Sequence, residues 1–137
     1  METADVRRRV NESIERAKRQ AAERRSRTDE AGRAYDQFLD RVAVPLFRQI
    51  ANVLRAEGYS FNVFTPSGSV RLMSDRRAED FVEVVLDTSG SAAQVVGHAS
   101  RSRGRRVEES ERDLGEPAAL TEAELLDYVM KELEPLL

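Results

Sequence analysis

The chain has 137 residues, of which 40% are hydrophobic and 34% charged, and its formal net charge at pH 7 is −3. This length suits one domain with a single hydrophobic core. The absence of cysteine excludes disulfides, zinc–thiolate sites and cysteine nucleophiles. No run approaches the ~18 apolar residues of a membrane span, and no apolar stretch typical of a secretory signal follows the first residues. We therefore expect a cytoplasmic protein that makes no membrane contact.

The charges are unevenly distributed along the chain. Residues 1–33 contain ten basic and seven acidic side chains, a net charge of +3, whereas residues 108–137 contain two basic and ten acidic side chains, a net charge of −8. All basic residues except Lys18 and Lys131 are arginine, which is typical of a GC-rich, bacterial-type genome. A basic start and an acidic end favour pairing within or between copies as readily as binding to a foreign polyanion.

Residues 4–57 are predicted to be helical. From Ile14 to Val42, a seam of residues recurs at alternating spacings of three and four, which is the period of a coiled coil. The seam is weak between Ala17 and Ala31, where small or polar residues such as Arg24 replace Leu and Ile. Between residues 2 and 33 the helix has no Leu, Phe, Met, Tyr or Trp, so it has little apolar area with which to hold itself against its own core. We therefore predict that it forms a homodimer or docks on an unknown protein partner. The predicted contact residues are Ile14, Ala17, Ala21, Thr28, Ala31 and Tyr35.

Three residues are expected to interrupt or end this helical region. Gly32 costs about 1 kcal/mol against Ala inside a helix, and it marks a joint at which Thr28 or Asp29 caps a second helix. Pro45 lacks a backbone donor, so a kink or restart is expected at this point. Gly58 fits the end of the helix, where a positive φ is common. We accordingly divide the chain into a charged helical extension, 1–33, and a single α+β domain, 34–137.

After Gly58 the apolar period changes from about 3.6 to two, which indicates β-strands. Four strands and a possible fifth are separated by turns rich in Gly and Ser, and such short connections favour antiparallel neighbours. The fifth is highly charged, as suits a sheet edge. The expected strands cover residues 59–63, 70–73, 81–88, 93–99 and 106–114.

Thr121 and Glu124 form a capping-box pattern at the start of a last helix, 121–134. The predicted fold is therefore α+β, a four- to five-stranded antiparallel meander sheet. One face is covered by the helices 38–57 and 121–134, and a long charged N-terminal helix precedes it.

No residue pattern indicates catalysis. His98 is the only histidine, and no locally placed partner is apparent for a catalytic triad or a transition-metal site. Glu83 and Asp87 lie on the same face of one predicted strand, but about 13 Å apart, too far to share one ion. We therefore predict no catalytic residue, no metal ligand and no cofactor.

The most concentrated positive charge lies at a predicted hairpin tip, around Gly104. Arginines on such a tip can contact phosphates, although no aromatic side chain lies nearby to stack on bases. The candidate polyanion-binding residues are Arg101, Arg103, Arg105 and Arg106. Our first hypothesis is a noncatalytic interaction module or adaptor that self-associates through its N-terminal helix. The alternative is a nucleic-acid-associated protein that uses these arginines and the basic helix, and a hydrolase with no visible site is a distant third.

Overall fold

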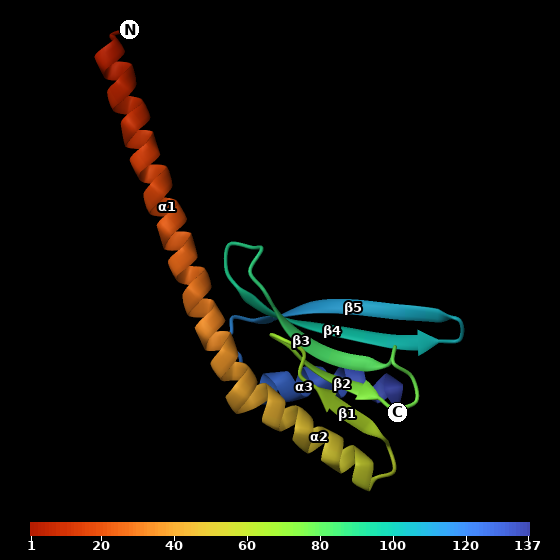
Figure 1. Ribbon diagram of the computed structural model, residues 1–137. Coiled ribbons are helices and arrows are strands. Elements are labelled where there is room, and N and C mark those ends of the chain that lie inside the picture. The colour runs from red at the N-terminus through yellow and green to blue at the C-terminus, as the bar shows by residue number, and fades with distance from the viewer. The chain divides into compact units, whose positions relative to one another are not determined.

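The computed structural model describes all residues from Met1 to Leu137. They form two units, Met1–Glu30 and Ala31–Leu137, and each is described by itself. The first unit consists almost entirely of the N-terminal part of helix α1, Thr3–Phe38. The second unit contains the end of α1 together with all other helices and strands (Figure 1).

The second unit is built on one five-stranded antiparallel sheet in which each strand pairs with the next along the chain. This order confirms the predicted meander, and the charged fifth strand is present at one edge of the sheet. The strands are β1 (Phe61–Phe64), β2 (Val70–Ser74), β3 (Phe81–Asp87), β4 (Gln94–Arg103) and β5 (Arg106–Gly115).

Helices α2 (Val44–Ala56) and α3 (Glu122–Leu133) lie on the same side of this sheet (Figure 1). Because successive side chains of a strand point to opposite faces, one face collects the apolar residues of the strands. Leu72, Val82, Val84 and Val95 have no exposed surface on that face, and they form one core with the apolar sides of both helices. The predicted two-helix cover is therefore present.

A single turn of π-helix, Leu39–Ala43, joins α1 to α2. The backbone N–H of Val44 donates to the carbonyl of Leu39, five residues earlier, and Pro45 occupies the first turn of α2. Proline is tolerated in a first turn because its missing donor has no partner there. The expected restart therefore occurs at Val44, and a π-turn accommodates it.

Helix α1 continues without interruption through Gly32, so the predicted joint and second N-cap near Thr28 are wrong. A lone glycine weakens a helix by about 1 kcal/mol but keeps its backbone hydrogen bonds. The other predicted ends are confirmed. Gly58 has a φ of 91° beyond the end of α2, and Thr121 and Glu124 form the reciprocal capping box of α3.

One close contact fixes α3 against the sheet. The ring of Tyr128 lies over Gly97 of β4, where an added Cβ atom would stand 2.2 Å from the tyrosine Cζ. Only glycine allows the ring this approach. None of the helices combines the length and the apolar composition that crossing a bilayer would require.

Candidate interaction surfaces

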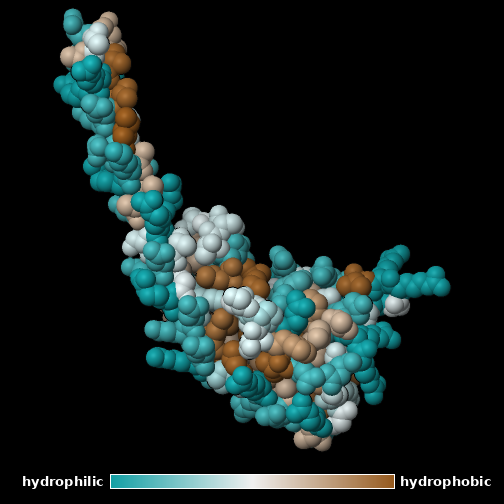
Figure 2. All heavy atoms as spheres, in the orientation of Figure 1, coloured by the Kyte–Doolittle hydropathy of each residue, from teal (hydrophilic) through white to brown (hydrophobic).

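An apolar stripe follows one side of α1 near its N-terminus. Val6, Val10 and Ile14 are spaced by four residues and are 45%, 51% and 45% exposed, so they lie on one side of the helix. Ala17 and Ala21 continue the stripe at spacings of three and four. Figure 2 shows the apolar side chains gathered along this part of the helix, surrounded by polar ones. We call these five residues the α1 stripe.

The predicted contact residues separate into two groups. Five of the six lie on one surface of the helix. Of these, three are exposed, Ile14, Ala17 and Thr28, and two are half-buried, Ala21 and Ala31. The sixth belongs to the core of the second unit.

Tyr35 is only 3% exposed, and its hydroxyl donates to the carbonyl oxygens of Gly68, at 2.7 Å, and Val84, at 3.3 Å. Its assignment to a self-association seam is therefore wrong. The heptad spacing runs through both units, and spacing alone does not separate a surface stripe from a core contact. Burial also raises the pKa of the Tyr35 hydroxyl, which keeps the phenol neutral and able to donate.

Val6 and Val10 belong to the stripe but are not among the contact residues predicted from the sequence. Both are exposed and apolar, and both precede Ile14 at helical spacing. The signal was present in the sequence as an i, i+4, i+8 pattern, but the neighbouring arginines at 7–9 gave that segment a polar average. The longest apolar side chains of the stripe therefore lie nearer the N-terminus than predicted.

The side chains that flank the stripe are basic. In a heptad, the positions next to the seam decide which charges meet a partner. Between Val6 and Arg27 these positions and the seam itself hold no acidic residue, because the acidic side chains lie on the outer side of the helix. Two ion pairs form in this unit, Asp5–Arg8 and Glu15–Lys18, both highly exposed. The cations at or beside the stripe are Arg7, Lys18, Arg24, Arg25 and Arg27.

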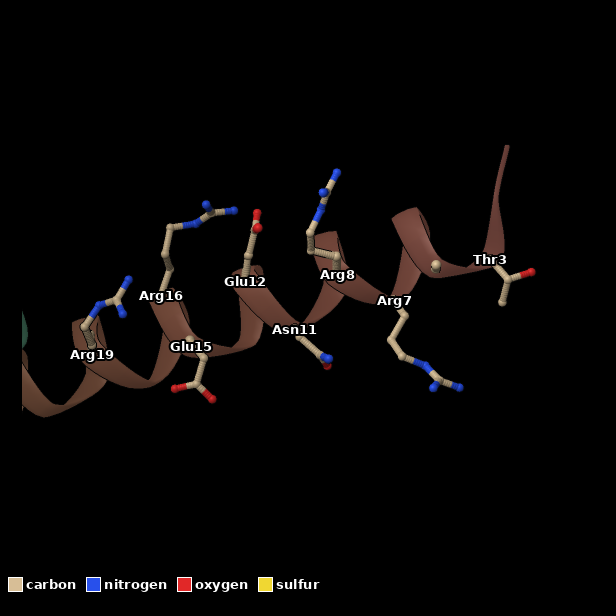
Figure 3. Close-up of a pocket in the computed structure, with 9 residues that line it drawn as sticks. Thr3, Arg7, Arg8, Asn11, Glu12, Glu15, Arg16 and Arg19 are labelled. Carbon is tan, nitrogen blue, oxygen red and sulfur yellow. The ribbon is translucent and has the colours of Figure 1, made fainter.

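The N-terminal turns of α1 also border a hollow, but all of its lining residues come from this one helix (Figure 3). Arg7, Asn11 and Glu15 point to one side of the helix, whereas Arg8, Glu12, Arg16 and Arg19 point to the other. Because these side chains diverge, they cannot enclose a ligand. The hollow is a property of a long exposed helix rather than a binding pocket.

The predicted arginine tip lies at the β4–β5 turn, and two of its four cations are already paired. Arg101 contacts Glu108 of β5 through Nε at 2.9 Å and Nη2 at 2.8 Å, and Arg103 contacts the same carboxylate at 3.6 Å. Hydrogen bonds from Arg101 hold the pKa of Glu108 below its usual value. Arg105 and Arg106 are exposed and make no ion pair. The tip therefore carries less free positive charge than its sequence indicated.

The sheet face away from the helices carries a polar cluster that was not predicted from the sequence. Glu83 of β3 is 7% exposed. It accepts from Arg71 of β2 at 2.9 Å and contacts Nδ1 of His98 of β4 at 2.8 Å. The other ring nitrogen of His98 lies 3.6 Å from Glu109 of β5, and Phe81 lies beneath the Arg71 guanidinium. His98 therefore does have partners, which antiparallel pairing brings from neighbouring strands.

These contacts explain why a carboxylate is tolerated at Glu83. Burial by itself raises the pKa of this group, but hydrogen bonds from Arg71 and His98 outweigh burial and lower the pKa. Glu83 is therefore a charged, fully partnered side chain. No group of three or more His, Asp or Glu residues is arranged to hold a metal ion, and the cluster is accounted for as a cross-strand ion-pair network.

Comparison with known proteins gives no family: no protein-family model, no curated protein and no solved structure matches this chain.

Proposed function

We propose that this protein is a noncatalytic interaction module that self-associates through α1, with residues 31–137 as the folded scaffold. The observation that carries the proposal is the exposed α1 stripe, above all the half-exposed side chains of Val6, Val10 and Ile14. It lies on the part of α1 that belongs to the unit Met1–Glu30.

The energetics of an isolated helix support this reading. Every residue from Met1 to Glu30 except Ala21 is exposed, so tertiary packing contributes almost nothing to this part of α1. In proteins, most of the stability of a helix comes from tertiary packing of its apolar side rather than from the intrinsic propensity of its residues. Burying the stripe on another surface would add about 25 cal/mol for each Å² of apolar area removed from water. A partner surface is therefore the natural source of its stability.

A second copy of the chain is the partner that the sequence pattern favours. The 3-4 spacing continues along α1 as it does in helices that pair with one another. The small side chains of Ala17 and Ala21 permit close approach at the centre of the stripe. The opposite charges of the two ends of the chain, +3 for residues 1–33 and −8 for residues 108–137, allow attraction between copies.

The double variant Val10→Gln/Ile14→Gln tests this proposal. Glutamine is a good helix former, so the change removes apolar area while keeping the helix and the charge. We expect the dissociation constant of the dimer to rise roughly tenfold or more, because two apolar side chains lose their burial. Sedimentation-equilibrium ultracentrifugation of the full-length protein measures it.

The matched control is Val53→Gln. Val53 is 59% exposed on α2 and lies outside the stripe, so its replacement should leave the dissociation constant unchanged. The proposal is wrong if the Val10/Ile14 variant and the control associate equally well.

Nucleic-acid association is a second candidate, favoured by Arg105 and Arg106, which make no ion pair, and by the basic residues beside the α1 stripe. It requires binding to duplex DNA or RNA at low salt that weakens steeply as salt is added. Absence of binding at low salt by fluorescence anisotropy would exclude it.

A further inference from the structure

We propose that the surface receiving the α1 stripe is the exposed side of helix α3 in a second copy of the chain. The inference rests on the proposed self-association and identifies the second half of that contact. It is carried by an apolar row on α3 that its own domain leaves uncovered, and by the charges beside it.

Helix α3 has two apolar sides. Leu125, Tyr128, Val129 and Leu133 are buried against the sheet. The outer side carries Ala123, Leu126 and Met130, which recur at spacings of three and four. We call these three residues the α3 stripe. All three are exposed, and Leu126 and Met130 are 36% and 45% exposed, so the fold leaves a second apolar row open to solvent.

The charge beside the α3 stripe is negative. Asp127 directly follows Leu126 in α3, and Glu134 lies seven residues further on, at the start of the 3-10 turn Glu134–Leu136 that follows α3. Both carboxylates are exposed and neither takes part in an ion pair or hydrogen bond within the chain. Lys131 is the only basic residue between 113 and 137. The α3 stripe is therefore bordered by free acidic groups.

The α1 stripe has the complementary pattern. Lys18 directly follows Ala17, and Arg25 lies seven residues further on, so the two cations repeat at the same interval as Asp127 and Glu134. Both helices thus present a 3-4 apolar row with charges of opposite sign beside it. Such complementary rows favour docking and select the partner.

Pairing of two α1 helices in parallel is less favourable on the same grounds. It would stack Arg24 of the seam against its own copy, a like-charge contact that weakens association, and it would offer Lys18 and Arg25 no carboxylate, because the stripe and the positions beside it hold none. On α3 the same cations meet carboxylates. Charge complementarity therefore favours α3 of the second copy as the surface that α1 contacts.

Charge reversal in the full-length protein tests the contact. One variant is Lys18→Glu/Arg25→Glu on α1, and the other is Asp127→Lys/Glu134→Lys on α3 and the turn that follows it. Each alone should raise the dimer dissociation constant roughly tenfold or more, because like charges then face each other. An equimolar mixture should recover the wild-type constant, since the reversed α1 of one chain meets the reversed α3 of the other.

Two control variants make the same change in net charge elsewhere. Arg16→Glu/Arg19→Glu alters the outer side of α1, and Glu111→Lys/Asp113→Lys alters strand β5. Both should dimerise like the wild type. Mixing the reversed α1 variant with the β5 control should not recover the full affinity, although the net charges equal those of the rescuing pair. Circular dichroism confirms that each variant keeps its helix content.

The outcomes separate this inference from the proposal beneath it. If the reversed α1 variant dissociates while the reversed α3 variant dimerises like the wild type, α1 mediates assembly elsewhere and the α3 contact is refuted. Failure of the two reversed variants to rescue each other refutes it as well. A wild-type protein that is monomeric throughout overturns self-association itself.

Discussion

Glu83 is the one charged side chain that the sheet buries, and its surroundings show what keeps it there. Arg71 and His98 hydrogen-bond its two oxygens from the neighbouring strands, so the cost of burial is offset by charge-assisted bonds. These bonds hold its pKa below the ordinary value of 4.5 despite burial. A carboxyl group of this kind stabilises the fold above its unfolded pKa, and the contribution is lost as the pH falls through the folded pKa.

The variant Glu83→Gln should therefore lower the free energy of unfolding at pH 7 by about 1.5–3 kcal/mol, the range for hydrogen bonds to a charged group. The difference from the wild type should shrink as the pH falls below the ordinary pKa of 4.5 and through the lowered pKa of Glu83, because protonation then removes the same charge from the native glutamate. Urea unfolding at pH 7 and at an acidic pH below the ordinary pKa of glutamate measures the loss of stability and its dependence on pH. Glu111→Gln, which removes an exposed carboxylate without a hydrogen bond, is the control. An equal difference at both pH values would contradict the assigned role.

Gly97 offers a second test at the scale of one residue. In Gly97→Ala the new Cβ atom would meet the Tyr128 ring at 2.2 Å, and overpacking of this kind costs about 1–3 kcal/mol. Gly32→Ala is the matched control, because no atom lies within 4 Å of its added Cβ and alanine favours the helix by about 1 kcal/mol. Thermal unfolding should move in opposite directions for the two variants. A Gly97→Ala protein as stable as the wild type would mean that α3 does not pack on β4 in this way.

At the scale of elements, local patterns predicted most of the fold. Three kinds of local pattern predicted structure that is present in the fold. They are the segments with apolar residues at every second position, the turns between them, and the capping box at Thr121. The path of α1 through Gly32 was predicted wrongly, because a single weak residue does not end a long helix. Tyr35 was misassigned because its hydroxyl partners, at Gly68 and Val84, come from segments distant in sequence. The Glu83 cluster was missed for the same reason, since it depends on strand register.

The division of the chain into the units Met1–Glu30 and Ala31–Leu137 predicts what the first part of α1 contributes to folding. A variant that lacks residues 1–30 loses no buried side chain, because that segment has none. It retains Tyr35 and the rest of the core. We expect residues 31–137 to unfold cooperatively in urea with a free energy close to that of the monomeric full-length chain. Loss of cooperative unfolding in this variant would show that the helix is part of the fold rather than an extension of it.

At the scale of the whole molecule, the chain divides its apolar surface between two uses. The sheet and the inner sides of α2 and α3 bury one set of residues in a single core. A second set on α1 and α3 remains open to solvent, with basic groups beside one row and acidic groups beside the other. Scattered exposed apolar residues are ordinary on protein surfaces, but two rows at matching spacing with opposite charges are suited to each other. The self-association that we propose would use both.

The most direct test of this account is the molar mass of the full-length protein by light scattering coupled to size-exclusion chromatography, measured from low to high micromolar concentration. We expect the mass to rise with concentration to twice the chain mass of 15.5 kDa, and the variant without residues 1–30 to remain monomeric throughout. A full-length protein that stays at 15.5 kDa up to high micromolar concentration would contradict the account.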